Sequence, residues 1–386
     1  MTIHTVKNGE RIEDIAREYG VAKEPLIRNN GLLTEPAVGE ELLILTPTRT
    51  HIAGHRDTAE RLLLRFGISR RTLLSCNPGI GERELKAGDT VVIRYSEPTY
   101  GMGASCGMVY KGCSEEKLRT ALPYLTYLGI CSAYIDDDIG CIFDDKALLE
   151  LAISGDKIPL LRLYDRKEGR SYESKDEREA LADKIVSFAS ERGYRGVVLS
   201  KMTDVCGAGD FLVEMRKRML GCDLILLTEV DESSPSYMSD LADGSIFSYS
   251  GTYNDMSFGN AERAYEKFAN ECESAKTMVE LPVFARCKSG YIPIEDALST
   301  ARRRRYELHQ SGDSLTAAFS DGNDEYCIPT LKNIKATLDK IHEYGFMGGS
   351  FDVARAPTAY FAMYNALFRP AIYTAVRAPE GCSRES

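Results

Sequence analysis

Tryptophan, long hydrophobic runs and a surplus of basic residues are all missing from this chain of 386 residues. No apolar stretch reaches roughly 18 residues, the length that a membrane-spanning helix needs, so we expect no membrane partner. The formal net charge of −10 argues against nucleic-acid binding, because that function needs a basic surface. The missing tryptophan removes the broadest aromatic ring on which a flat ligand can stack.

Cysteine occurs eleven times, an odd number, but closely spaced cysteine pairs are missing. Without a Cys-x-x-Cys motif the sequence predicts neither a disulfide framework nor a zinc site, and this usage fits a reducing compartment. The chain begins Met1-Thr2-Ile3-His4 and passes directly into a folded pattern, without the apolar segment of a signal peptide. We therefore expect synthesis in the cytoplasm, no metal and no other cofactor.

The N-terminal part of the chain contains one pattern twice. Each copy reads as a strand, a turn, two short helices and a second strand within about 45 residues, which indicates an internal repeat. The copies occupy 1–47 and 50–96, and a short proline-containing link follows each. Thr58 and Ser69 precede apolar residues at helical spacing, so both are predicted helix N-caps.

Both copies resemble LysM modules, small α+β (βααβ) units whose pattern is Tyr-x-Val-x-x-Gly-Asp-Thr-Leu…Asn…Gly-x-x-Leu-x-Ile. The resemblance implies binding of N-acetylglucosamine-containing glycans, peptidoglycan or chitin, in a groove between two loops. Arg56 departs from the usual turn glycine and Glu10 from the usual aspartate. The alternative is that these are only turn and cap residues of modules that have lost their ligand. The implied groove residues are Gly9, Glu10, Arg11, Asn30 and Glu35 in the first module, and Arg56, Asp57, Thr58, Asn77 and Pro78 in the second.

Residues 99–370 alternate short aliphatic strands with amphipathic helices, which indicates a parallel sheet with helical crossovers. Eight candidate strands over this length fit an α/β fold, a (β/α)8 TIM barrel. Before the last strand, 288–329 is expected as a small α+β insertion with a hairpin turn at 320–323, and 371–386 as a C-terminal tail. The predicted strands are 102–109, 127–134, 158–163, 196–202, 224–229, 245–249, 278–284 and 346–351.

The candidate fourth strand follows a Gly-Tyr pair and reads Arg-Gly-Val-Val-Leu-Ser-Lys-Met over 195–202. It resembles the fourth barrel strand of glycoside hydrolase family 18, Asp-Gly-Val-Asp-Ile-Asp-Phe-Glu. Arg195, Val198, Ser200 and Met202 stand at the acidic positions. In the family the last acid protonates the leaving oxygen, and its neighbour supports the substrate's own acetamide as nucleophile. A thioether has no proton to give, so the resemblance implies a strand without its chemistry.

Alternation along a strand predicts that Val198, Ser200 and Met202 all face the barrel interior. Further matches to the family lie at 247–250, 279–285 and 348–353. They place Tyr249 where the family's tyrosine contacts the substrate acetamide, although a buried structural tyrosine is an equal alternative. They also place Asp352 where a tryptophan normally forms the floor of the sugar pocket.

Several other acids near strand ends are candidates for a displaced catalytic role, with Asp204 and Glu229 foremost and Asp210 and Asp231 beside them. Each also has an ordinary alternative role as a loop or N-cap residue. Glu280 stands where the family has a strand glycine, and a carboxylate there needs a partner or a raised pKa. The triplet at 136–138 is expected as a solvated hairpin turn rather than a cation site.

Paired LysM modules ahead of such a barrel resemble the cortex-fragment-lytic N-acetylglucosaminidases of bacterial endospores, which are made in the mother cell without a secretion signal. The leading interpretation is a glycan-binding protein of the spore envelope, deposited in the coat or cortex, with a degenerate and inactive barrel. One alternative is an active N-acetylglucosaminidase that uses a displaced carboxylate. The other is a structural component that binds spore coat proteins.

Overall fold

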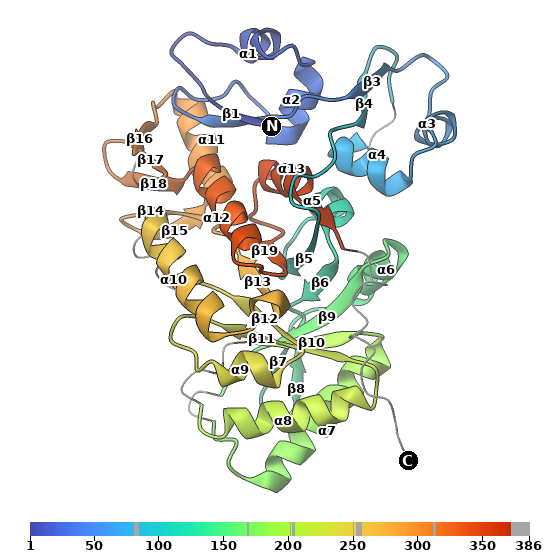
Figure 1. The fold of residues 1–386 in the computed structure, drawn as a ribbon, viewed down its shortest axis with the longest axis vertical. Helices are drawn as coiled ribbons and strands as arrows, with labels where there is room; N and C mark the ends of the chain where they lie inside the picture. Colours follow the sequence, from blue (N-terminus) through green and yellow to red (C-terminus); the bar gives the residue numbers. More distant parts are fainter. Residues whose placement is uncertain are drawn as a thin grey trace.

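The two N-terminal modules each pair two strands beside two short helices (Figure 1). In the computed structural model the first contains β1 (Thr2–Thr5), α1 (Ile12–Glu18), α2 (Lys23–Asn30) and β2 (Glu41–Ile44). The second contains β3 (Arg49–Ile52), α3 (Ala59–Phe66), α4 (Arg70–Cys76) and β4 (Thr90–Arg94). Both strand pairs are antiparallel, so the predicted βααβ order is confirmed. The structure describes residues 1–80, 85–167, 170–200, 202, 205–249, 251, 257–311 and 314–371.

Helix capping in the second module follows the sequence closely. Thr58 accepts a hydrogen bond from the N–H of Arg61, and Ser69 accepts one from the N–H of Thr72. Both are therefore N-caps, as predicted, and satisfy backbone donors that the first helical turn leaves unpaired.

Eight parallel strands close a barrel, because each pairs with the next and the last pairs with the first. The predicted (β/α)8 fold is thereby confirmed, and each barrel strand overlaps its predicted segment. A two-residue strand, β20 (Arg369–Pro370), adds to the start of the first strand. The barrel strands are β5 (Met102–Val109), β6 (Tyr127–Ile130), β9 (Ile158–Leu163), β10 (Gly196–Leu199), β11 (Ile225–Val230), β12 (Gly244–Phe247), β13 (Thr277–Glu280) and β19 (Gly348–Asp352).

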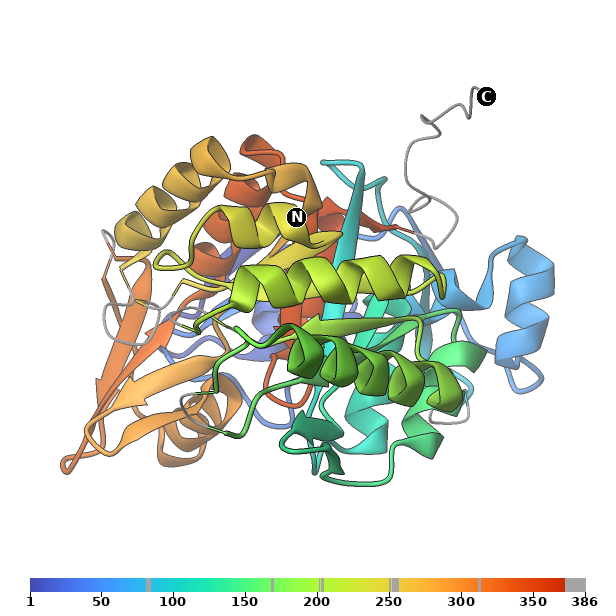
Figure 2. The same cartoon turned by 90° about the horizontal axis from the view of Figure 1, so that it is seen from below.

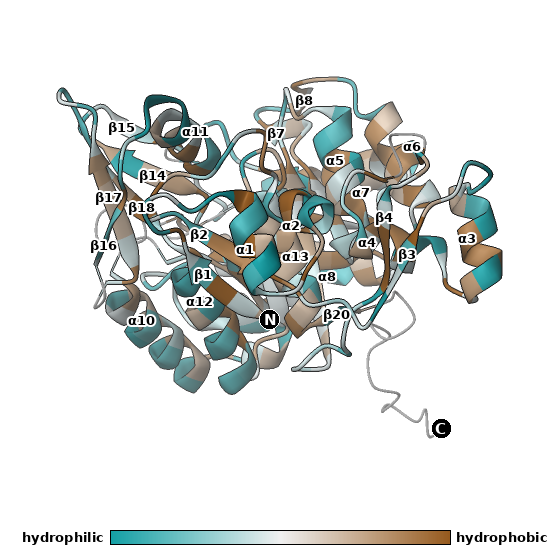
Figure 3. Cartoon of the chain, turned by 90° about the horizontal axis from the view of Figure 1, so that it is seen from above, coloured by the Kyte–Doolittle hydropathy of each residue, from teal (hydrophilic) through white to brown (hydrophobic). Residues whose placement is uncertain are grey.

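Helices surround the barrel, and the helix that follows the third strand runs beside the helix that follows the fourth strand (Figure 2). A small apolar cluster that includes Cys106, Val198 and Met278 fills the barrel interior, and a larger one lies between the strands and the helices. Hydrophilic colour marks much of α10 and α12 (Figure 3). No helix in the described ranges has both the length and the apolar character to cross a bilayer. The helices are α5 (Glu115–Ala121), α6 (Lys146–Ser154), α7 (Lys175–Arg192), α8 (Ala208–Leu220), α9 (Tyr237–Leu241), α10 (Phe258–Glu271), α12 (Leu331–Glu343) and α13 (Thr358–Leu367).

Two additions interrupt the barrel. The hairpin β7 (Ala133–Ile135) and β8 (Ile139–Cys141) follows β6, and its turn holds the acidic triplet at 136–138. The seventh barrel strand ends at Glu280, earlier than the predicted Phe284, and Phe284 instead begins the insertion. Pro282 has no N–H to donate to a neighbouring strand, which favours the end of the strand before it. The insertion contains β14 (Phe284–Cys287), β15 (Gly290–Pro293), α11 (Ile294–Arg304), β16 (His309–Ser311), β17 (Thr316–Ser320) and β18 (Glu325–Pro329).

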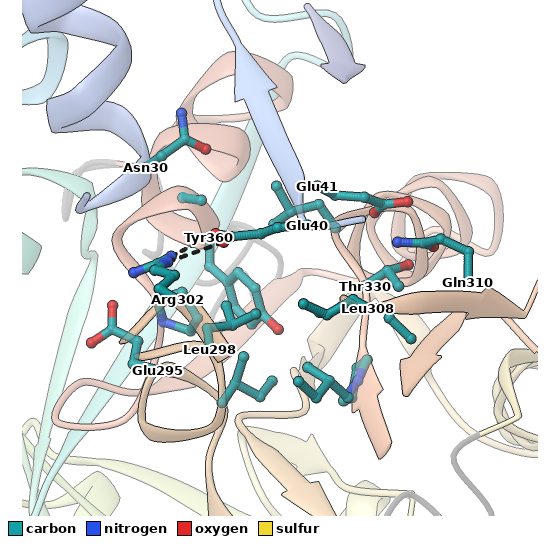
Figure 4. Close-up of a pocket in the computed structure, with 17 residues that line it drawn as sticks. Asn30, Glu40, Glu41, Glu295, Leu298, Arg302, Leu308, Gln310, Thr330 and Tyr360 are labelled. Atoms are coloured by element: carbon teal, nitrogen blue, oxygen red, sulfur yellow. Dashed lines mark hydrogen bonds and ion pairs between the residues drawn. The ribbon is translucent and has the colours of Figure 1, made fainter. Parts of the chain in front are cut away.

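The first module is fixed against this insertion by a buried ion pair (Figure 4). Arg302 of α11 donates to both oxygens of Glu40, at 3.0 Å from Nε and 2.6 Å from Nη2. The N–H of Leu308 donates to the carbonyl of Val38 at 2.8 Å. Gly39 has φ +81°, and a Cβ there would meet the Leu308 carbonyl oxygen at 1.9 Å, so only glycine permits this approach. These contacts therefore fix the position of the first module relative to the insertion of the barrel.

Candidate functional site

Several residues expected in the glycan grooves hold the modules' own loops. Glu10 accepts a hydrogen bond from the N–H of Lys7 at 2.7 Å and contacts Nε2 of His4 at 2.9 Å. Asp57 repeats this arrangement in the second module, with the N–H of Gly54 at 2.9 Å and Nε2 of His51 at 2.7 Å. Both acids therefore stabilise the first turn of their module. The hydrogen bond from the Lys7 N–H lowers the pKa of Glu10, and that from Gly54 lowers the pKa of Asp57.

Only some of the groove residues named from the sequence are exposed to solvent. Glu35 accepts a hydrogen bond from the N–H of Ile12 at 3.0 Å, which ties together the two loops of the first module. The residues of the expected set that are exposed to solvent are Gly9, Arg11, Glu35, Arg56 and Thr58.

Asn30 and Asn77 are buried at matching positions of the two modules. The Asn30 amide donates to the carbonyls of Leu26 and Leu43 and accepts from the N–H of Leu43. The Asn77 amide makes the same contacts with Leu73 and Val92. Each side chain thus joins the second helix of its module to the second strand. This corrects the expectation that the two amides face a glycan, and Pro78 is likewise buried.

The fourth barrel strand is shorter than predicted and ends at Leu199. Val198 lies in the interior cluster, and Ser200 bonds across the carboxyl-terminal mouth of the barrel, so both face inward as expected. Met202 is 6% exposed and belongs to the larger cluster with Leu199, not to the interior cluster. The expected interior placement therefore fails for Met202, because the regular alternation of the strand has ended before it. Asp204 lies outside the described residues.

An ion pair crosses the carboxyl-terminal mouth of the barrel. Arg162 of β9 donates to both oxygens of Glu229 of β11, at 2.5 Å from Nε and 2.8 Å from Nη2. Ser200 lies between them, 3.3 Å from Nη2 of Arg162, and donates to Oε2 of Glu229 at 3.1 Å. Burial opposes the charged guanidinium, but Glu229 holds the pKa of Arg162 above its ordinary value. The Glu229 carboxylate is thus fully engaged by neighbours in the chain.

Little space remains beside this pair. The cavity at the mouth has a volume of about 70 Å³, well below the range of about 300–1,000 Å³ that is typical of ligand pockets. The pKa of Glu280 is raised to about 7, chiefly by burial and then by the negative charge of Glu229, against the opposing charge of Arg162. The residues that line the cavity are Met108, Tyr110, Arg162, Glu229, Ile246, Ser248, Glu280 and Ser350.

The other acids considered from the sequence have local partners. Asp352 pairs with Arg355, whose guanidinium lies 5.2 Å from the ring centre of Phe284. Asp231 is buried and accepts from Ser233 and Ser234 in the loop after β11. The exposed Asp210 lies 3.5 Å from Arg178, and Tyr249 is half-buried against the larger apolar cluster. Among the described residues, no group of three or more potential ligands is arranged to hold a metal ion.

Arg162 is the residue that the sequence interpretation missed. It is the one charged residue in the otherwise apolar strand Ile158–Leu163. A lone charge in such a strand indicates a buried partner, because an unpaired buried charge is very costly. The sequence could not identify that partner, since Glu229 lies 67 residues further along the chain.

Comparison with known proteins supports both parts of the architecture. The LysM domain family matches residues 4–42 and 55–94. No curated protein sequence gives a significant match. The solved structure of the spore cortex-lytic enzyme SleL from Bacillus megaterium QM B1551 is similar over 96% of this chain and 98% of that one, with a TM-score of 0.74 and 18% identity.

Two further structures have the same fold. SleL from Bacillus cereus matches 96% of this chain and 99% of that one, with a TM-score of 0.73 and 15% identity. A chitinase from Chromobacterium violaceum matches 68% of this chain and 98% of that one, with a TM-score of 0.59 and 12% identity. At these identities the likeness establishes the fold alone. The chain therefore carries two LysM domains followed by a family 18-like (β/α)8 barrel, in an architecture similar to that of the SleL enzymes.

Proposed function

We propose that this protein binds N-acetylglucosamine-containing glycans of the bacterial spore envelope and does not hydrolyse them. The two LysM domains indicate glycan binding, and the likeness to spore cortex-lytic enzymes suggests cortex peptidoglycan as the ligand and the coat or cortex as the place of deposition. The exposed loop residues named above are the proposed contact points.

One observation carries the non-hydrolytic part of the proposal, namely the ion pair across the barrel mouth. A working site needs an acid that can reach the glycosidic oxygen and space for the sugar around it. Here Arg162 and Ser200 occupy the Glu229 carboxylate, and the remaining cavity is about 70 Å³. Ser200 and Met202 meanwhile stand where the family has its Asp and Glu.

Weak N-acetylglucosaminidase activity is the second candidate, and Glu280 is the observation that favours it. A carboxyl group with a pKa near 7 suits a general acid, which donates best when its pKa lies near the working pH. This activity would require the Arg162–Glu229 pair to open, because the closed mouth leaves no room for a sugar.

The test uses the full-length protein in two assays. In the first, it is pelleted with insoluble peptidoglycan and with chitin, beside an Arg11→Ala/Arg56→Ala variant that changes one exposed loop residue in each LysM domain. Arg195→Ala, an exposed arginine on the barrel, is the matched control. We expect the loop variant to lose binding and the control to keep it; equal binding by all three proteins would contradict the proposed contact surface.

The second assay measures release of soluble sugar from cortex fragments and chitooligosaccharides. We expect turnover below about 0.1 per second, a low value for enzymes. Faster turnover that disappears in Glu280→Gln or in Glu229→Gln would establish the hydrolase instead and would identify its acid.

A further inference from the structure

A second and larger cleft lies at the opposite end of the barrel from the mouth. It runs between α4 of the second LysM domain and the segment that leads from α6 into β9, at the amino-terminal ends of the strands. Its volume of about 390 Å³ falls within the range of about 300–1,000 Å³ that is typical of ligand pockets. Both the LysM domain and the barrel contribute to it, so the cleft exists only in the assembled chain.

Basic side chains dominate the wall of this cleft, which has Arg70, Arg71, Arg119 and Lys157 but a single acid, Asp156. Two of these cations have acidic partners outside the wall. Nη1 of Arg70 lies 3.7 Å from Glu60, and Arg119 binds Glu115 through Nε at 2.8 Å and Nη2 at 2.6 Å. The charge that lacks an acidic partner therefore belongs to Arg71 and Lys157.

Arg71 uses part of its guanidinium to hold the LysM domain on the barrel. Its Nε donates to the carbonyl of Pro123 at 2.9 Å and its Nη2 to that of Leu125 at 3.3 Å. These neutral carbonyls do not compensate the positive charge; the charge of Asp156 acts to raise the pKa of Arg71, but burial outweighs it and lowers that pKa overall. The contacts fix the guanidinium beside the cleft, with donors to spare.

Lys157 is the more unusual of the two cations, because its side chain is only 6% exposed. Within the described part of the chain, its Nζ has neither a hydrogen-bond acceptor nor a carboxylate at ion-pair distance. Burial and the charge of Arg71 lower the pKa of Lys157 to about 7, although the charge of Asp156 acts in the opposite direction. A buried amine that faces a cleft without a partner is costly in its charged form, and an anion in the cleft would remove that cost.

We propose that this cleft is a binding site for an oxyanion, the carboxylate or phosphate group of a ligand, held between Lys157 and Arg71. A fixed guanidinium beside an ammonium is a donor set that suits such groups. The negative charge of the exposed Asp156 repels an anion, so the ligand must bind closer to Arg71 and Lys157 than to Asp156. The site is separate from the exposed loops of the LysM domains, and the inference stands whether or not those loops bind glycans.

The experiment is a calorimetric titration of the full-length protein with sodium phosphate and, separately, with sodium acetate, at constant ionic strength. We expect saturable binding of at least one, and the tighter of the two identifies the group. Lys157→Met should weaken binding by about tenfold or more, because it removes a charged hydrogen-bond donor from the anion. Lys146→Met, an exposed lysine on α6, is the matched control and should bind like the unmodified protein. Absence of saturable binding, or equal binding by Lys157→Met, would overturn the proposal.

A second measurement works on the unmodified protein and does not depend on the folding of a variant. Acetic anhydride labels free amines, and mass spectrometry reports the labelled fraction of each lysine. We expect the bound anion to slow the labelling of Lys157 and to leave that of Lys146 unchanged. Labelling of Lys157 that is the same with and without either anion would also overturn the proposal.

Discussion

Glu280 offers the sharpest test of the electrostatic environment at the barrel mouth, because that environment makes ionisation of its carboxyl group unfavourable. Its folded-state pKa is raised from 4.5 to about 7, first by burial and then by the charge of Glu229. The folded protein therefore holds a proton on Glu280 that the unfolded chain releases between these two pH values. The sign follows from linkage: this group lowers stability as pH rises from 4.5 through 7, and its full cost is present above pH 7.

The size of the effect follows from the same values. A rise from 4.5 to about 7 corresponds to about 3 kcal/mol at about 1.36 kcal/mol for each pH unit, as an order of magnitude. Glu280→Gln keeps the shape of the side chain but removes the ionisation. We expect the variant to gain up to about 3 kcal/mol of stability at pH 8 and less than about 1 kcal/mol at pH 5.

Urea unfolding followed by far-ultraviolet circular dichroism suits this chain, which has no tryptophan for fluorescence. Glu150→Gln, an exposed glutamate on α6, is the control and should change stability at neither pH. A gain of equal size at both pH values, or a loss at pH 8, would refute the reasoning. Either result would mean that the folded mouth accommodates the ionised Glu280, so that burial and Glu229 do not dominate its environment.

Three further expectations concern residues that hold the structure together. Arg162→Met leaves the half-buried Glu229 with Ser200 but without its cation, and it should lower stability by less than the about 3–5 kcal/mol that breaking a fully buried pair costs; adding Glu229→Gln should restore most of the loss in the same urea experiment. Asn77→Ala removes the amide that joins helix and strand in the second LysM domain. We expect the free energy of unfolding to fall by about 1–3 kcal/mol and the backbone amides of this domain to exchange hydrogen faster. Unchanged exchange would contradict the structural role of Asn77. Arg302→Met breaks the pair with Glu40, so limited proteolysis should cut the first LysM domain faster. An unchanged rate of cleavage would mean that the pair does not fix this domain against the barrel.

Local sequence patterns were enough to predict most elements of this protein and the order in which they follow one another. The repeated pattern predicted two βααβ units, and the spacing of apolar segments predicted eight barrel strands, because both signals are local and set by the periods of strands and helices. The caps Thr58 and Ser69 were predictable for the same reason. The resemblance of 195–202 to the fourth strand of family 18 also predicted, from the sequence alone, that Ser200 and Met202 stand at the family's acidic positions.

The contacts that individual side chains make could not be predicted in this way, because they depend on the tertiary fold. Asn30 resembled a groove residue, but closing the module buries its amide against Leu43. The partnership of Arg162 with Glu229 arises because closure of the barrel brings their strands to one mouth, on either side of β10. The cleft at Lys157 likewise exists only once a LysM domain is seated on the barrel. A residue's type and its nearest neighbours in sequence set the local conformation, whereas its partners depend on distances between segments far apart in the chain, which folding alone makes short.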